Sequence, residues 1–153
     1  MQIRLAEADD IQQLIQMRWD FTIEHDESKK STSFQEFETE CRSFLERALL
    51  NQQWFIWIAE EQGKILSHIY IECIHKVPRP GRITYPFAYM TNVYTLPEYR
   101  QKGIGSKLLH VIHDWTKENK YEFVLVWPSD EAIEFYKRSG YEVLTEPLIY
   151  YPK

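Results

Sequence analysis

Residues 91–109 read TNVYTLPEYRQKGIGSKLL, and this stretch decides how the rest of the chain is interpreted. The run FAYMTNVYTL, which begins at Phe87 and overlaps the start of this stretch, is rich in aromatic and β-branched residues. It predicts a strand that ends before Pro97. Apolar residues then recur at helical spacing after Gly103: Ile104, Leu108, Val111 and Trp115. The two glycines of KGIGS therefore lie in a turn between a strand and the start of a helix.

Such a turn is suited to binding an anion. The first turn of a helix has unpaired backbone N–H groups and the positive end of the helix dipole. Glycines at 103 and 105 let that backbone approach a ligand closely, so RQKGIGS is expected to hold a phosphate or pyrophosphate. Two other glycine patterns fit worse. The Walker A loop needs GxxxxGK[ST], whereas Ser106 precedes Lys107 here, and the dinucleotide fingerprint needs a third glycine where Leu108 stands.

Upstream of this stretch the sequence predicts one strand, two helices and a hairpin. IRLA is expected to form a short strand, and Asp9 or Asp10 to cap a helix whose apolar stripe also includes Arg18. A second helix begins near Ser33 with apolar residues every three or four positions. WFIWIAE and ILSHIYIECI, joined by EQGK, predict an antiparallel hairpin, after which the prolines of KVPRPGRITYP take the chain out of the sheet.

Downstream, the run YEFVLVW is almost wholly apolar. This pattern is typical of a central strand that is covered on both faces. A further helix is expected from residues 128–130 to Gly140, and YEVLTEPLIYYP predicts one or two closing strands. The order of elements indicates a mixed α/β domain, and since no repeat or linker divides the sequence, residues 1–153 are expected to form a single domain.

Composition limits the classes of partner. A formal net charge of −5 disfavours a long nucleic-acid footprint, which relies on many basic residues. No segment approaches the roughly 20 apolar residues of a membrane span, and acidic residues occupy the start of the chain, so we expect a soluble, cytoplasmic protein without nucleic-acid or membrane partners. Cys41 and Cys73 have no CxxC spacing and are expected to be reduced packing residues.

The sequence resembles the GNAT superfamily of acyl-CoA-dependent N-acetyltransferases. Its signature, [QR]xxGxG/A after a strand, is filled by Arg100, Gly103 and Gly105. The opening IRLAEADDI, the apolar run FVLVW and the segment AIEFYKRSGYE extend the resemblance over nearly the whole chain. It implies a mostly antiparallel central sheet with helices on both faces, and acetyl-CoA as co-substrate.

The resemblance also implies roles for residues of the central stretch. Val93, Tyr94 and Thr95 would bind the pantetheine arm, with the amides of Val93 and Thr95 pairing with it as an added half-strand, next to a bulge near Asn92. Arg100 and Lys102 would add charge near the pyrophosphate. The backbone amides that would hold the pyrophosphate belong to Gln101, Lys102, Gly103, Ile104, Gly105 and Ser106.

Tyr136 matches the family tyrosine that donates a proton to the departing thiolate of coenzyme A. The general base is left open, because Thr91 and Asn92 stand in the region where many members place a glutamate. Strand alternation places His68 and Glu72 on one face, which makes either one a candidate base, alongside a substrate amine that needs none. We expect no metal: His110 and His113 have a ligand spacing, but no third ligand accompanies them.

These observations predict an N-acetyltransferase that transfers an acetyl group to a primary amine of a small molecule or peptide by direct attack in a ternary complex. In this family the acceptor pocket would involve EHDESKKSTS and HKVPRPGRITYPFAY, where Trp19, Phe21, Tyr85 and Phe87 could line an apolar wall and the acidic residues near His25 could face a cationic amine. Two alternatives stay open: a non-catalytic acyl-CoA sensor, and an interaction domain with a purely structural turn. A homodimer also stays open.

Overall fold

A five-stranded sheet in the order β1-β2-β3-β4-β5 runs through the middle of the molecule in the computed structural model, which describes residues 1–152. Neighbouring strands β1 to β4 pair antiparallel, whereas β5 pairs parallel with β4. This arrangement confirms the prediction of a mixed, mostly antiparallel sheet. The strands are β1 (Gln2–Leu5), β2 (Trp54–Glu61), β3 (Lys64–Ile74), β4 (Phe87–Thr95) and β5 (Val124–Val126).

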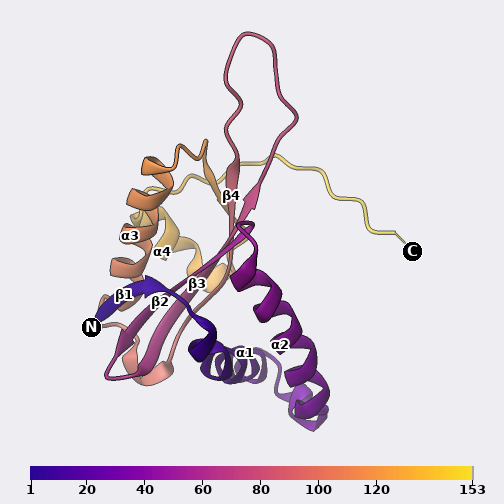
Figure 1. Ribbon diagram of the computed structural model, residues 1–153, viewed down its shortest axis with the longest axis vertical. Helices are drawn as coiled ribbons and strands as arrows, with labels where there is room; N and C mark the ends of the chain where they lie inside the picture. Colours follow the sequence, from indigo (N-terminus) through magenta and orange to yellow (C-terminus); the bar gives the residue numbers. More distant parts are fainter. Residues whose placement is uncertain (153) are drawn as a thin grey trace.

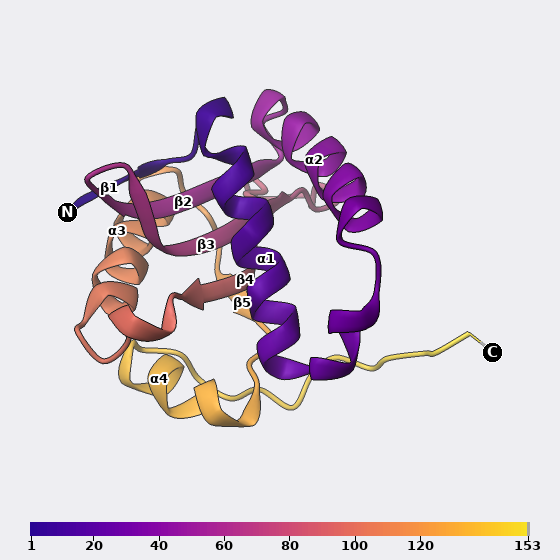
Figure 2. The same cartoon turned by 90° about the horizontal axis from the view of Figure 1, so that it is seen from below.

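Helices cover both faces of the sheet, as predicted. In Figures 1 and 2, α1 and α2 lie against one face, and α3 and α4 against the other. Short 3-10 turns precede or follow these helices. The helical elements are η1 (Ala8–Asp10), α1 (Ile11–His25), η2 (Glu27–Ser31), α2 (Phe34–Leu50), η3 (Pro97–Tyr99), α3 (Ile104–Glu118), η4 (Asp130–Ala132) and α4 (Ile133–Arg138).

Strand alternation divides the core between the two faces. On β3, Tyr70 packs with Leu14 of α1, whereas its neighbours Ile69 and Ile71 pack with Leu108 of α3. Because successive side chains of a strand point to opposite faces, one strand supplies both apolar clusters. The sheet is therefore held between two helical layers and forms a rigid support for the loops at the end of β4.

The capping residues predicted for the first two helices differ in their outcome. Ser33 caps α2, where its Oγ accepts a hydrogen bond from the Glu36 N–H at 3.2 Å. Asp10 precedes α1, but its carboxylate does not cap that helix. It accepts two hydrogen bonds from Arg4, at 2.7 and 3.0 Å, and one from the Glu7 N–H at 2.7 Å. The charge pair therefore fastens β1 to the segment that leads into α1.

Two predictions for the last third of the chain were wrong. The run YEFVLVW was expected to form a central strand, but β5 is short and lies at the edge of the sheet, with all its residues only half-buried. The closing strands expected in YEVLTEPLIYYP do not form within the described residues. The two differences are linked, because β5 stays at the edge of the sheet when the segment after Gly140 runs on without pairing with it.

Candidate functional site

A β-bulge in β4 opens the sheet at the candidate site. Thr91 pairs with Tyr70 of β3, but the next paired residue, Tyr94, lies opposite His68, so two residues of β4 oppose one of β3. Asn92 in the bulge has φ 49°, a left-handed conformation. Pairing between β4 and β5 ends at Met90, just before the bulge. The two strands therefore separate from this point.

Two side chains hold Asn92 in the bulge. His68 of β3 hydrogen-bonds through Nδ1 to the Asn92 carbonyl at 2.8 Å, and Arg18 of α1 donates to Asn92 Oδ1 at 3.2 Å. His68 is completely buried, and burial lowers its pKa to about 4, so its ring is neutral at pH 7 and Nδ1–H is the donor. Its enclosure suits a role in fastening the bulge better than a direct contact with substrate.

Beyond the bulge, β4 has backbone groups that face the opening. Leu96 N–H donates to the Leu66 carbonyl of β3 at 2.9 Å, so the amide of residue 96 points toward β3. Because backbone groups alternate along a strand, the amides of Val93 and Thr95 point to the other side, where β5 no longer pairs. An extended ligand can add to β4 at these two amides.

The glycine turn closes one end of this opening. Gly103 has φ 77° and precedes α3, and the backbone ladder of that helix starts with the bond from Lys107 N–H to the Gly103 carbonyl at 3.0 Å. The amides of Ile104, Gly105 and Ser106 come before this bond and have no acceptor within the helix. These three amides belong to the turn that the sequence predicts to hold a pyrophosphate.

Arg100 is oriented differently from the sequence-based expectation. Its guanidinium donates to both carboxylate oxygens of Glu24, at 2.6 and 2.7 Å, and its Nε donates to the Thr95 carbonyl at 3.0 Å. The hydrogen bonds to Arg100 hold the pKa of Glu24 below its usual value. The side chain therefore ties α1 to the turn, and its charge is already paired, whereas Lys102 lies against the ring of Tyr99 at 5.1 Å.

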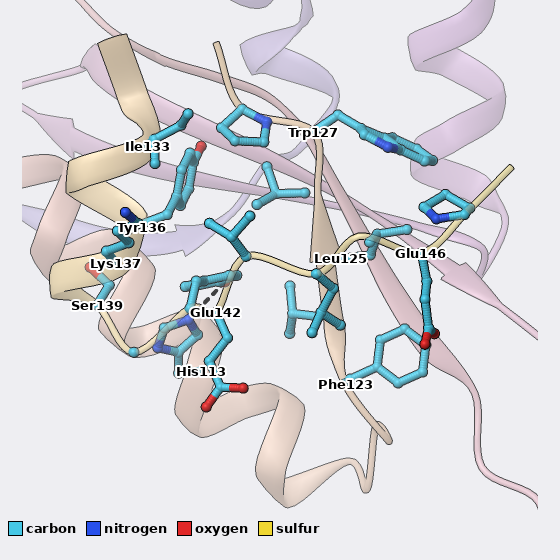
Figure 3. A pocket seen from close by; sticks show the side chains of 18 residues that line it. His113, Phe123, Leu125, Trp127, Ile133, Tyr136, Lys137, Ser139, Glu142 and Glu146 are labelled. Carbon is cyan, nitrogen blue, oxygen red and sulfur yellow. Dashed lines mark hydrogen bonds between the residues drawn. The ribbon is translucent and has the colours of Figure 1, made fainter. Parts of the chain in front are cut away.

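Tyr136 of α4 lies in a cavity of about 760 Å³ beside β5. Its side chain is buried, and this burial raises the pKa of the phenol to about 12. Figure 3 shows Tyr136 next to Ile133, on the side of the cavity opposite Leu125 and Phe123. Its neighbour Phe135 approaches the glycine turn: a Cβ added to Gly105 would lie 3.8 Å from the Phe135 ring and 3.6 Å from Thr95 Oγ1.

Glu72 lies further along β3, opposite Tyr89 and away from the buried His68. It is half-buried and accepts a hydrogen bond from Gln53 Nε2 at 2.8 Å. The aromatic residues expected to line one wall do not gather. Trp19 packs on Phe34 and Phe37, Phe21 packs on Tyr94, and Phe87 stacks on Phe123.

Other candidates have ordinary structural contacts. His113 Nε2 lies 2.9 Å from the Tyr141 hydroxyl, and His110 lies 3.6 Å from Asp114, so the two histidines do not converge. Among residues 1–152, no group of three or more potential metal ligands occurs. No helix in the same range is both long enough and apolar enough to cross a membrane. Cys41 and Cys73 are free thiols.

Sequence reasoning missed the roles of Arg18 and Glu24. Both belong to α1, and they contact Asn92 and Arg100 respectively, more than 70 positions away in the sequence. A signal was present for Arg18, since a charged residue in an otherwise apolar helical stripe needs a buried polar partner. Nothing in the local sequence distinguishes Glu24 from the other acidic residues near the end of this helix.

A strand opened by a bulge, next to a helix start whose first amides have no acceptor within the helix, defines an α/β domain whose backbone groups suit an extended ligand with an anionic end. The family model described as "Acetyltransferase (GNAT) domain" matches residues 2–144, and the chain belongs to this family. Membership confirms the resemblance that the sequence motifs indicated, and it makes the chain an acetyltransferase by family.

Solved structures agree with this assignment. A predicted acetyltransferase from Clostridium acetobutylicum, crystallised with acetyl-CoA, aligns with a TM-score of 0.81 and 27% identity over 98% of this chain and 95% of that one. A GCN5-related N-acetyltransferase from Ralstonia eutropha aligns with a TM-score of 0.78 and 22% identity over 98% of this chain and 97% of that chain, which shows a shared fold.

A curated relative matches part of the chain. Streptothricin acetyltransferase A of Bacillus subtilis (strain 168) is 30% identical over 84 residues, which make up 52% of this chain and 48% of that protein. The alignment therefore spans about half the length of the relative.

Proposed function

We propose that this protein transfers an acetyl group from acetyl-CoA to a primary amine of a small molecule or peptide, by direct attack of the amine within a ternary complex. The observation that carries the proposal is the alignment of two sets of unpaired amides, on β4 after the bulge and at the start of α3. The first set suits the amide-bearing pantetheine arm, and the second suits a pyrophosphate. Bound acetyl-CoA would supply an activated thioester carbonyl.

The chain's own residues would bind and orient this co-substrate. Val93 and Thr95 would hydrogen-bond to the arm through their amides, with Tyr94 between them facing α1. The turn Gln101–Ser106 would hold the pyrophosphate through main-chain donors, and the lack of a side chain at Gly103, where an added Cβ would meet no atom within 4 Å, would let the ligand approach the backbone. Arg100 would fix the turn through Glu24 and Thr95, and Lys102 would supply a cationic side chain at its exposed rim.

Tyr136 is proposed as the hydrogen-bond donor to the departing thiolate. With a pKa of about 12, its phenol stays protonated at neutral pH and can donate a hydrogen bond to developing negative charge. Because a free thiol has a pKa near 8.5, below that of this phenol, complete proton transfer to the thiolate is unfavourable, and Tyr136 would act by donating a hydrogen bond that stabilises the thiolate as it departs. Burial therefore keeps the phenol of Tyr136 protonated at the start of each turnover.

The general base is proposed to be Glu72, acting through water. Between the two candidates, Glu72 is accessible, whereas His68 is enclosed and engaged with the Asn92 carbonyl. His68 is then a positioning residue. Glu72 lies further along β3 than the residues that face the bulge. A second candidate function is therefore a non-catalytic acyl-CoA sensor with the same binding surface.

Calorimetric titration with acetyl-CoA tests the binding surface. Gly105→Glu would place a carboxylate where the pyrophosphate is expected, and binding should be lost. The matched control is His110→Glu, which adds the same charge to an exposed position of α3 and should bind as the wild type does. Wild-type affinity in Gly105→Glu would refute the binding site.

A thiol-release assay with a panel of primary amines separates the enzyme from the sensor. Amine-dependent release of coenzyme A supports transfer. Binding without release for any amine would support the sensor and contradict the proposed reaction.

A further inference from the structure

Four aromatic side chains of β4 and the residues around β5 form two contacting pairs. Phe87 stacks on Phe123 with ring centroids 4.8 Å apart, and Tyr89 meets Trp127 edge to face at 5.2 Å. Phe123 and Trp127 are 47% and 58% exposed, and none of the four rings belongs to a core cluster of residues 1–152. Exposed aromatic groups gathered in this way are typical of a surface that binds a ligand.

The pair of Tyr89 and Trp127 lies at the mouth of the opening between β4 and β5. Met90 and Val126 are the last residues that pair the two strands, and Trp127 follows directly. A ligand that is anchored at the glycine turn and extends along the β4 amides reaches this opening with its far end. The reacting end of the proposed co-substrate would therefore arrive next to Trp127.

The rings differ in whether a cation already faces them. Lys76, which is paired with Glu122, places its Nζ 6.0 Å from the ring centroid of Phe123. Among residues 1–152, no lysine or arginine side chain lies over Tyr89 or Trp127. Indole is the aromatic side chain that attracts cations most strongly. Trp127 is therefore suited to receive a cation from a ligand.

Two carboxylates give the surroundings of this pair a negative character. Glu72 is directly opposite Tyr89 in the pairing of β3 with β4, so both side chains point to the same face of the sheet. Glu146 lines the cavity beside β5 together with Trp127, and Figure 3 shows both on the side of β5 away from Tyr136. Carboxylates next to an exposed aromatic pair favour a cationic ligand over a neutral or anionic one.

The chemistry of transfer restricts which group of the acceptor can bind there. A nitrogen that attacks the thioester has to be neutral, whereas a group bound over an aromatic face is attracted only while it is charged. The two groups are therefore different parts of one acceptor. Tyr89 precedes Thr91, the last paired residue before the bulge, by two residues, which corresponds to about 7 Å along a strand.

We propose that the acceptor is a primary amine with a second, cationic group about 7 Å from the reacting nitrogen, and that Trp127 and Tyr89 bind this cation beside Glu72. The inference rests on the proposed acetyl transfer and names its acceptor class. In the reaction the neutral nitrogen forms a bond to the thioester carbon, the C–S bond breaks to release coenzyme A as a thiolate, and the proton of the nitrogen passes through water to Glu72. The bound cation takes no part in bond making.

A thiol-release assay with two matched amines tests this inference. Putrescine carries a second ammonium group, whereas n-pentylamine has a methyl group in its place on a chain of equal length. Trp127→Leu should lower the ratio of kcat/KM for putrescine to that for n-pentylamine about tenfold, mainly through the KM for putrescine, and Trp127→Phe should restore most of it. Comparing this ratio between proteins cancels the different basicity of the two amines.

Tetramethylammonium gives a second readout, because it has no nitrogen that can accept an acetyl group. It should compete with putrescine in the wild type and more weakly in Trp127→Leu. Circular dichroism and calorimetric titration with acetyl-CoA check the fold and the co-substrate site of each variant. An unchanged ratio in Trp127→Leu, or no competition by tetramethylammonium, would overturn the inference and leave amine acetylation standing. No thiol release with any amine, despite binding of acetyl-CoA, would overturn the inference together with the proposed reaction.

Discussion

The bulge in β4 makes a specific prediction about residue 92. Asn92 has φ 49°, which costs an ordinary L-residue such as alanine about 1–2 kcal/mol, whereas glycine adopts this conformation freely. Glycine loses about 0.4–1 kcal/mol relative to alanine through the greater freedom of the unfolded chain. The balance predicts that Asn92→Gly is more stable than Asn92→Ala by about 0.5–1 kcal/mol.

This comparison isolates the backbone because both variants lose the same contact. Each removes the hydrogen bond from Arg18 to Asn92 Oδ1, and each keeps the bond from His68 to the carbonyl. Both should therefore be less stable than the wild type, while their difference reports the left-handed conformation. Urea denaturation followed by circular dichroism gives the free energy of unfolding of each variant.

The same two substitutions at a helical position should give the opposite order of stability. At Glu46, an exposed residue of α2, alanine should be more stable than glycine by about 1 kcal/mol. If alanine were as stable as glycine at residue 92, the bulge would not require a left-handed residue, and the proposed opening between β4 and β5 would lose its structural cause.

Three further predictions follow from the site. Tyr136→Phe should lower kcat about 100-fold with little change in the KM for acetyl-CoA, and an unchanged kcat in steady-state assays would remove its role as donor. Burial lowers the pKa of His68 to about 4 from 6.5, so its stabilising contribution is complete above pH 6.5 and is lost as the pH falls toward 4. Between pH 6.5 and pH 4 the free energy of unfolding of the wild type, measured by urea denaturation, should therefore fall by about 3 kcal/mol more than that of His68→Gln. Equal decreases in the two proteins would contradict the burial of a neutral ring. Glu24→Gln should lower the free energy of unfolding by about 0.5–1 kcal/mol at low salt and by almost nothing in 1 M NaCl, because the ion pair with Arg100 is partly exposed. A decrease that does not depend on salt in urea denaturation would refute an electrostatic role for the pair.

The sequence predicted the parts of the site that depend on local patterns. The turn at Gly103 and Gly105 and the start of α3 follow from glycine spacing and helical periodicity, which act over a few residues. The position of β5 did not follow, because a run of apolar residues specifies a buried strand without specifying what covers it. The orientation of Arg100 was also inaccessible, since its partner Glu24 is 76 positions away.

One helix supports both halves of the candidate site through two charged side chains of α1. Arg18 contacts the bulge at Asn92, and Glu24 contacts Arg100 at the glycine turn. The bulge sets the direction of the amides on β4, and the turn sets those at the start of α3. A shift of α1 would therefore move both sets of amides together. Since η2 follows α1 after Asp26 and lies within the segment expected to contact the acceptor, we expect acceptor binding that shifts α1 to shift the amides proposed to hold the co-substrate as well.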